Sequence, residues 1–146
     1  MLAALLGGLI LSGLTIYAGM LLARLRRQQA MQWQAITARN EQILESVRVI
    51  AHAVQEGQCD YSEGAIRLTN LLDALQIKGG RAFVAEFPGL YGLYEKVKDM
   101  PTHEARRALK RNEVMKMDLE RSGYEAELEA QILKDVAQLK DFQLGR

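Results

Sequence analysis

The sequence predicts an all-α protein: one N-terminal transmembrane helix continues into an elongated cytoplasmic helical hairpin or bundle, with short helices at the tip. Three observations support this prediction. The first 23 residues have no charged side chain, two later segments keep apolar residues at helical spacing, and only two prolines occur in 146 residues. The 19 basic and 18 acidic residues nearly balance, which argues against a basic nucleic-acid-binding domain. A single cysteine excludes a disulfide scaffold.

Residues 1–23 are expected to form a retained transmembrane helix. At the helical rise they span about 34 Å, enough to cross a hydrocarbon core of about 30 Å. A signal peptide would begin with basic residues and have a shorter apolar run. The basic residues Arg24, Arg26 and Arg27 instead follow the segment. Because basic flanks stay in the cytoplasm, we expect the N-terminus outside and a cytoplasmic domain over residues 24–146.

Small residues recur at four-residue intervals within this first segment. Ala4, Gly8 and Ser12 lie on one row of the expected helix, and such rows allow two helices to approach closely. One interpretation is a homodimer formed through this face. The other is that small residues are common in membrane helices whatever their partners.

Residues 24–56 are expected to form a helical stalk that continues the transmembrane helix. No glycine or proline interrupts this segment. Its apolar residues recur at steps of three and four, which predicts one buried stripe made of Ile36, Ile43, Leu44, Val47, Ile50, Ala51 and Val54. Asn40 falls on the same stripe, where a polar residue can fix the register of packed helices. We expect Asn40 at the edge of the stripe.

Short helices are expected over residues 60–100. Gly57 ends the stalk, and Asp60 begins the next helix, with Glu63 as its capping-box partner. Gly79 and Gly80 form a turn. The next segment is ambiguous, because its aromatic and β-branched residues suit a strand that has no predicted partner. We expect a short helix over Arg81–Phe87, followed by a second helix that starts at Pro88.

A long return helix is expected over residues 102–142. Thr102 is a suitable N-cap, no proline interrupts the segment, and Ser122-Gly123 is its one plausible kink. Two long helices joined by short ones predict a hairpin in which this helix runs back along the stalk.

This hairpin would bring several polar residues to its distal tip. They form the candidate interaction site: His52, Cys59, Asp60, Glu63, His103, Glu104 and Arg107. Such side chains can bind zinc, and Cys59 beside His52 or His103 could act as a nucleophile with a base. No pair has a metal-binding spacing that stands alone, so we assign no catalytic, cofactor-binding or metal-ligating residue. The alternative is a buried thiol with capping acids and ordinary histidines.

The densest basic run covers Arg106–Arg111. It suggests either nucleic-acid binding or a solvated helix face with ion pairs, to the acids near Asp60 among others. We expect the solvated face, and no nucleic acid as a partner, because acidic residues follow the run. The acids at positions 125, 127 and 129 are likewise expected to be solvated.

The leading functional hypothesis is a membrane-tethered, non-enzymatic adaptor or scaffold with the lipid bilayer and a protein as partners and no cofactor. One alternative is an enzyme or metal-binding protein that uses Cys59, His52 and His103. The other is nucleic-acid binding through the basic run.

Three stretches of the sequence carry a resemblance to a known family: Arg39–Arg48, Glu56–Leu68 and Leu93–Ala105. Together they resemble a gammaproteobacterial family of small, single-span, membrane-anchored proteins of unknown function. The resemblance implies a location in the bacterial inner membrane. It implies no activity and no catalytic residues.

Overall fold

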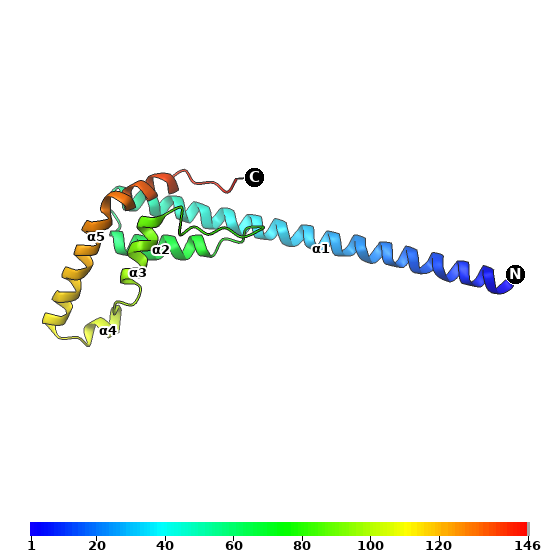
Figure 1. Cartoon of the computed structure of the whole chain (residues 1–146), viewed down its shortest axis with the longest axis horizontal. Helices are drawn as coiled ribbons and strands as arrows, with labels where there is room; N and C mark the ends of the chain where they lie inside the picture. Colours follow the sequence, from blue (N-terminus) through cyan, green and yellow to red (C-terminus); the bar gives the residue numbers. More distant parts are fainter. Residues whose placement is uncertain (146) are drawn as a thin grey trace. The chain divides into compact units, whose positions relative to one another are not determined.

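The computed structural model describes residues 1–145, and these residues form an all-helical protein without strands. The helices shown in Figure 1 are α1 (Leu2–Gln55), α2 (Tyr61–Asp73), α3 (Pro88–Val97), α4 (His103–Arg107) and α5 (Arg111–Leu139). The predicted span and stalk are therefore one uninterrupted helix. The chain divides into two compact units, residues 1–39 and the described residues from Asn40 onward.

The first unit is the apolar part of α1. All of residues 1–35 are exposed, and Leu9 retains 76% of its accessible surface. Among the described residues, α1 is the one helix long and apolar enough to cross a membrane by length and composition. The Ser12 hydroxyl donates to the Gly8 carbonyl at 2.8 Å, and the Thr15 hydroxyl donates to the Leu11 carbonyl at 2.7 Å. These two hydroxyl groups are therefore satisfied within the helix.

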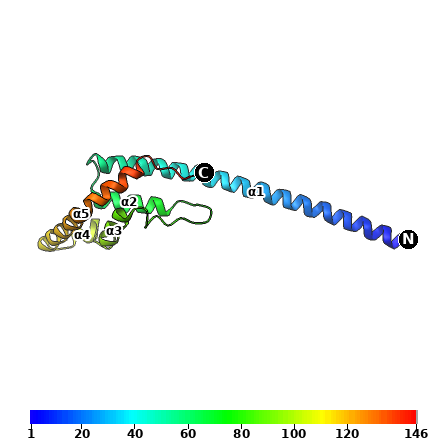
Figure 2. The same ribbon diagram turned by 45° about the horizontal axis from the view of Figure 1, so that its top comes forward.

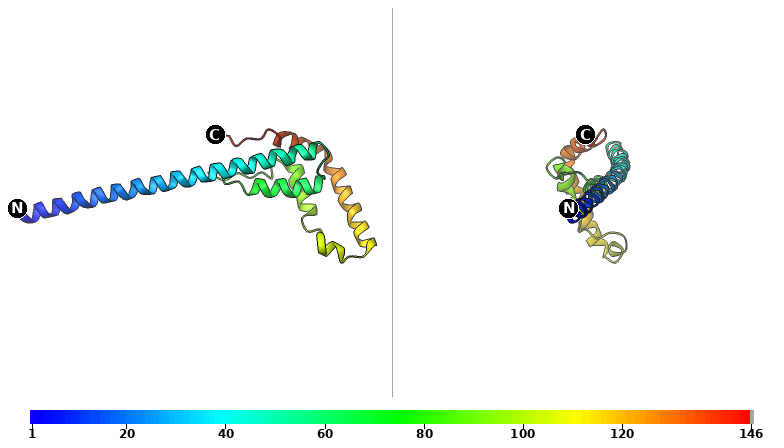
Figure 3. Two further views of the ribbon diagram at one scale, coloured as in Figure 1. Left: turned by 180° about the vertical axis from the view of Figure 1, so that it is seen from behind. Right: turned by 90° about the vertical axis from the view of Figure 1, so that its right-hand side faces the viewer.

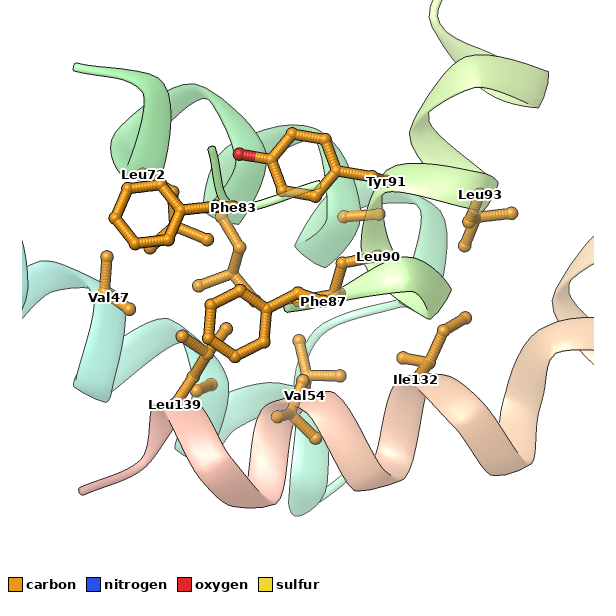
Figure 4. Packing of buried hydrophobic residues seen from close by; sticks show 14 of the residues in the cluster. Val47, Val54, Leu72, Phe83, Phe87, Leu90, Tyr91, Leu93, Ile132 and Leu139 are labelled. Carbon is orange, nitrogen blue, oxygen red and sulfur yellow. The ribbon is translucent and has the colours of Figure 1, made fainter. Parts of the chain in front are cut away.

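The second unit has its own hydrophobic core, built by α2, α3 and the C-terminal parts of α1 and α5 (Figure 4). The stripe predicted on α1 is largely confirmed, because Leu44, Val47, Ala51 and Val54 are buried. The other helices contribute apolar residues at the same helical spacing: Ala65, Leu68 and Leu72 from α2, Leu90, Leu93 and Val97 from α3, and Ile132, Val136 and Leu139 from α5. This core fixes the helices on which the candidate site is built.

Helix α3 packs against both α2 and α5 (Figure 2), and its approach to α5 is very close. A Cβ atom on Gly89 would lie 2.7 Å from the backbone nitrogen of Ile132 and 2.8 Å from the carbonyl carbon of Gln131. Only glycine permits this separation, because real side chains do not tolerate such contacts with a rigid backbone.

Asn40 is buried, so the predicted position at the edge of the stripe is wrong. Its side chain is 8% exposed, its Nδ2 donates to the Gln76 carbonyl at 2.7 Å, and its Oδ1 accepts the Gln76 N–H at 3.1 Å. Both functions of the amide are thus used by the segment that follows α2. Asn40 fastens that segment to α1.

The segment Arg81–Phe87 is a series of turns and not the short helix that we expected. Side-chain burial holds it in place, because Phe83 and Phe87 are buried and both rings contact Phe142 at centroid distances of 6.0 and 5.7 Å. The Arg81 guanidinium lies 5.3 Å from the Phe83 and Phe142 ring centroids. Aromatic contacts with a distant residue, and not the hydrogen bonds of a helix, therefore hold this segment in place.

The prediction of one long helix over residues 102–142 is also wrong, because this segment forms two helices, α4 and α5. Lys110 has the extended backbone of an N-cap, and the Glu113 carboxylate accepts its N–H at 2.9 Å. Gly123 lies inside α5 without ending it. Only the C-terminal part of α5, from Ile132 to Leu139, has buried residues, and α5 packs mainly on α3 and not along α1 as the hairpin predicted. The first half of α5 and α4 extend past the core (Figure 3).

Candidate functional site

A pocket of about 460 Å³ lies in the second unit between α2, the segment joining α3 to α4, α4 itself and the first half of α5. Its floor is apolar. Ile66 of α2 and Val97 at the end of α3 contribute aliphatic side chains, and Met100 and Met117 contribute flexible thioethers. Volumes of this size are typical of small-molecule and side-chain pockets.

The rim of the pocket is charged. Arg106 Nη2 lies 2.6 Å from Asp118 Oδ2, and Arg121 Nη2 lies 3.7 Å from the other oxygen of the same carboxylate. Across the pocket, Arg67 Nη2 lies 2.6 Å from Glu63 Oε1. The hydrogen bond from Arg106 lowers the pKa of Asp118, so this acid is ionised at neutral pH. Arg106 therefore pairs with an acid on α5 and not with the acids near Asp60.

Two rim atoms lack hydrogen bonds. Among the described residues, the buried Asp118 Oδ1 and Arg121 Nε atoms have no hydrogen-bond partner. Buried polar atoms are almost always paired in folded proteins, so this unpaired acceptor and donor mark an imperfectly satisfied contact between Asp118 and Arg121.

The structure separates the residues that we expected at a single tip. Glu63 and His103 line the pocket beside α4, and His103 begins that helix with a positive φ of 47°. His52 lines a different pocket, of about 630 Å³, together with Arg48 and Lys140. The two histidines therefore do not share a site. In residues 1–145 no three His, Cys, Asp or Glu side chains are grouped closely enough to hold a metal ion.

Three further predicted residues lie at the surface. Asp60, Glu104 and Arg107 are exposed. Asp60 is the N-cap of α2, as predicted, but its side chain makes no capping hydrogen bond, and Glu63 pairs with Arg67 instead of completing a capping box.

Cys59 is half-buried and packs beside Gly64. Burial, followed by the nearby carboxylate of Glu63, raises the pKa of its thiol; Arg67 partly opposes this shift, and Asp60 adds the smallest contribution. A thiol with a raised pKa is a weak nucleophile at neutral pH, because the thiolate is the reactive form.

The acids at positions 125, 127 and 129 were expected to be solvated. Glu127 and Glu129 are exposed, as predicted, but Glu125 is half-buried. Glu125 accepts hydrogen bonds from the Ser62 backbone at 3.1 Å and from the Ser62 hydroxyl, and Glu129 accepts one from the Tyr61 hydroxyl at 3.1 Å. These acids hold the N-terminus of α2 where Asp60 does not. Their spacing of one helical turn was the available signal, since it places both on one face of α5.

Asp135 was not identified from the sequence. It is 1% exposed, and its Oδ2 accepts the N–H groups of Gly89 at 2.7 Å and Leu90 at 3.1 Å. Gln131 Nε2 donates to Oδ1 at 2.9 Å. A carboxylate from α5 thus caps the N-terminus of α3, where the local sequence Phe87-Pro88 supplies no capping side chain.

Comparison with known proteins identifies relatives without an assigned activity. A family model described as "Protein of unknown function (DUF2489)" matches residues 11–139. The chain is 38% identical over 130 residues to a protein of Haemophilus influenzae described as uncharacterized, and the match covers 87% of this chain and 84% of the relative. No solved structure matches the chain. The predicted resemblance to a gammaproteobacterial family of unknown function is confirmed.

Proposed function

The chain belongs to the DUF2489 family of proteins of unknown function, and we propose that it is a membrane-anchored helical adaptor that holds a protein partner at the cytoplasmic face of the bacterial inner membrane. One observation carries the proposal: the chain divides into an exposed apolar helix and a separately packed unit that presents a pocket. A membrane anchor joined to a unit that binds another protein would hold that protein at the membrane.

The anchor is supported by the surface of the first unit. A continuous apolar face of this length is unfavourable in water, and no other part of the first unit covers it. Arg24, Arg26 and Arg27 follow the apolar segment, and the positive-inside rule then assigns the second unit to the cytoplasm.

Binding is favoured over covalent chemistry by the state of the polar side chains. The carboxylates of Glu63 and Asp118 each form an ion pair with an arginine at 2.6 Å, an arrangement that suits a fixed charge in a recognition surface better than a general base. The raised pKa of Cys59 keeps its thiol protonated at neutral pH. The pocket thus offers an apolar floor and fixed charges, which suit recognition of another molecule.

The test uses the full chain in living cells. A photo-crosslinking amino acid at Met117, which lines the pocket, is expected to capture a discrete protein, whose sequence is read by mass spectrometry. That protein should then leave the membrane fraction when the chain is deleted. The full chain should restore its location, and a Leu9→Arg, Leu14→Arg variant that disrupts the anchor should not.

A partner that keeps the same distribution with and without the chain would contradict the adaptor proposal. If the anchor variant fully restored the partner to the membrane fraction, the proposal that the first unit tethers the partner would be wrong.

A further inference from the structure

We infer that the pocket beside α4 binds a segment of the partner protein that carries apolar side chains next to a carboxylate. The inference rests on the proposed function, because an adaptor needs a surface that recognises its partner. The apolar side chains pack between Met100 and Met117, and the carboxylate binds the guanidinium of Arg121.

The floor of the pocket selects for apolar side chains. Apolar residues from α2, α3, α5 and the segment after α3 line the cavity, among them Ile66, Val97, Met100 and Met117. Methionine is unbranched and polarizable, which allows it to adapt to differently shaped apolar groups. The volume of about 460 Å³ accommodates one or two leucine-sized side chains but not a folded element.

The rim selects for negative charge. Three guanidinium groups face only two carboxylates there, and two of the three are paired at 2.6 Å: Arg67 with Glu63 and Arg106 with Asp118. Arg121 has only a 3.7 Å contact to the carboxylate that Arg106 already occupies. Its Nε has no hydrogen-bond partner among residues 1–145. The Arg121 side chain is partly exposed, so an incoming carboxylate could pair with the accessible part of its guanidinium and complete the charge balance, whereas a basic segment would meet an excess of like charge.

The wall formed by α4 can adjust to an occupant. This helix has no buried residue, so it makes no contribution to the core. The Arg106–Asp118 ion pair joins it to α5. A small displacement of α4 would therefore admit a segment without disturbing the packing of α2, α3 and α5.

The experiment measures binding of short fluorescein-labelled peptides to the full chain in lipid nanodiscs by fluorescence anisotropy. The first peptide is Ser-Gly-Leu-Leu-Glu-Leu-Gly-Ser. One matched peptide has Lys in place of Glu, and another has Ser in place of every Leu. We expect saturable binding of the first peptide and at least tenfold weaker binding of the other two. Empty nanodiscs correct for partition into lipid.

The chain offers a matched control for each pocket residue. Met117→Asp and Arg121→Glu should each weaken binding of the acidic peptide at least tenfold. Met115→Asp and Lys116→Glu place the same charges on exposed positions of the same helix outside the pocket, and should leave binding unchanged. Arg121→Glu should also bind the Lys peptide better than the wild type does. Met100→Gln is a milder second change to the floor, and unchanged amide protection in α3 verifies that each variant is folded.

Equal binding of the acidic and basic peptides would overturn the inference, as would equal losses in the pocket variants and their controls. Absence of saturable binding would also overturn it. If a second copy of the chain fills the pocket instead, Met117→Asp will change the mass of the assembly in nanodiscs and no peptide will bind. In any of these cases, a partner that still depends on the chain for its membrane location would show that the proposed function stands and that the recognition surface lies elsewhere.

Discussion

The buried carboxylate of Asp135 accepts the backbone N–H of Gly89 at 2.7 Å, which fastens the start of α3 to the face of α5. The same oxygen accepts the Leu90 N–H, and Gly89 lacks the Cβ that would collide with the α5 backbone. A buried charge, two hydrogen bonds and a close backbone contact therefore all stabilise the junction between α3 and α5. The position of α3, and with it the floor of the pocket at Val97, depends on it.

Removing the Asp135 carboxylate should destabilise the second unit. Asp135→Ala leaves two buried N–H groups without acceptors, so we expect a loss of about 3 kcal/mol in the free energy of unfolding. Asp135→Asn keeps an acceptor oxygen and should lose less. Denaturant unfolding measures the loss, and hydrogen exchange at Gly89 and Leu90 locates it. Lys134→Ala, at an exposed neighbouring position, is the control, and an equal effect there would refute this role of Asp135.

Two glycines give a matched pair for the packing of α3. Gly89→Ala forces a methyl group against the α5 backbone and should cost about 2 kcal/mol. Gly123→Ala meets nothing within 4 Å inside α5 and should be neutral or stabilise by up to about 1 kcal/mol. Thermal unfolding of the two variants decides the point. A Gly89→Ala variant as stable as the wild type would show that Gly89 does not lie against the α5 backbone.

The amide of Asn40 should stabilise the segment after α2. Asn40→Ala removes both hydrogen bonds to Gln76 and should cost about 1 kcal/mol, with faster hydrogen exchange at the Gln76 amide. Asn112→Ala, an exposed position on α5, is the control. Unchanged exchange at Gln76 would show that the Asn40 side chain does not hold this segment.

The ion pair between Arg81 and Glu86 should give a measurable pH dependence. The hydrogen bond from Arg81 lowers the pKa of Glu86 from its usual value of 4.5. The pair therefore contributes its full stability above about pH 4.5, and this contribution is lost as the pH falls through the lowered pKa. Because both side chains are partly exposed, we expect at most about 1 kcal/mol.

The measurement compares the melting temperatures of the wild type and Glu86→Gln. The variant should melt lower at neutral pH, and the difference should vanish under acid conditions where Glu86 is protonated. Glu45→Gln, at an exposed position of α1, should show no difference at either pH. A gap that persists in acid would mean that the stability difference does not arise from the carboxylate charge.

Much of the fold could be predicted because it depends on local patterns. The apolar stripe of α1 placed Val47, Ala51 and Val54 in the core, and Pro88 marked the start of α3. The features that escaped prediction depend on contacts between distant residues. The break before α5 occurs at Lys110, which is not a typical N-cap residue, although Glu113 is a typical capping-box partner. The turns over Arg81–Phe87 are held by aromatic packing against Phe142.

The candidate site was predicted less well than the fold. An antiparallel hairpin would have placed His52 with His103. In the structure His103 lines the same pocket as Glu63, and His52 lines another pocket. Asp118 and Arg121 were not singled out, because charged residues on a helix read as solvated until the neighbouring helix is known. Only the tertiary structure shows that they line a pocket with Met117.

The central claim is that residues 1–23 anchor the chain and that the second unit lies in the cytoplasm. The most direct test fuses two reporters separately after Arg146 of the full chain: a green fluorescent protein, which fluoresces only in the cytoplasm, and an alkaline phosphatase, which is active only outside it. We expect a fluorescent, phosphatase-negative protein that remains in the membrane fraction after alkaline carbonate extraction. Phosphatase activity without fluorescence, or release of the chain by carbonate, would contradict the central claim.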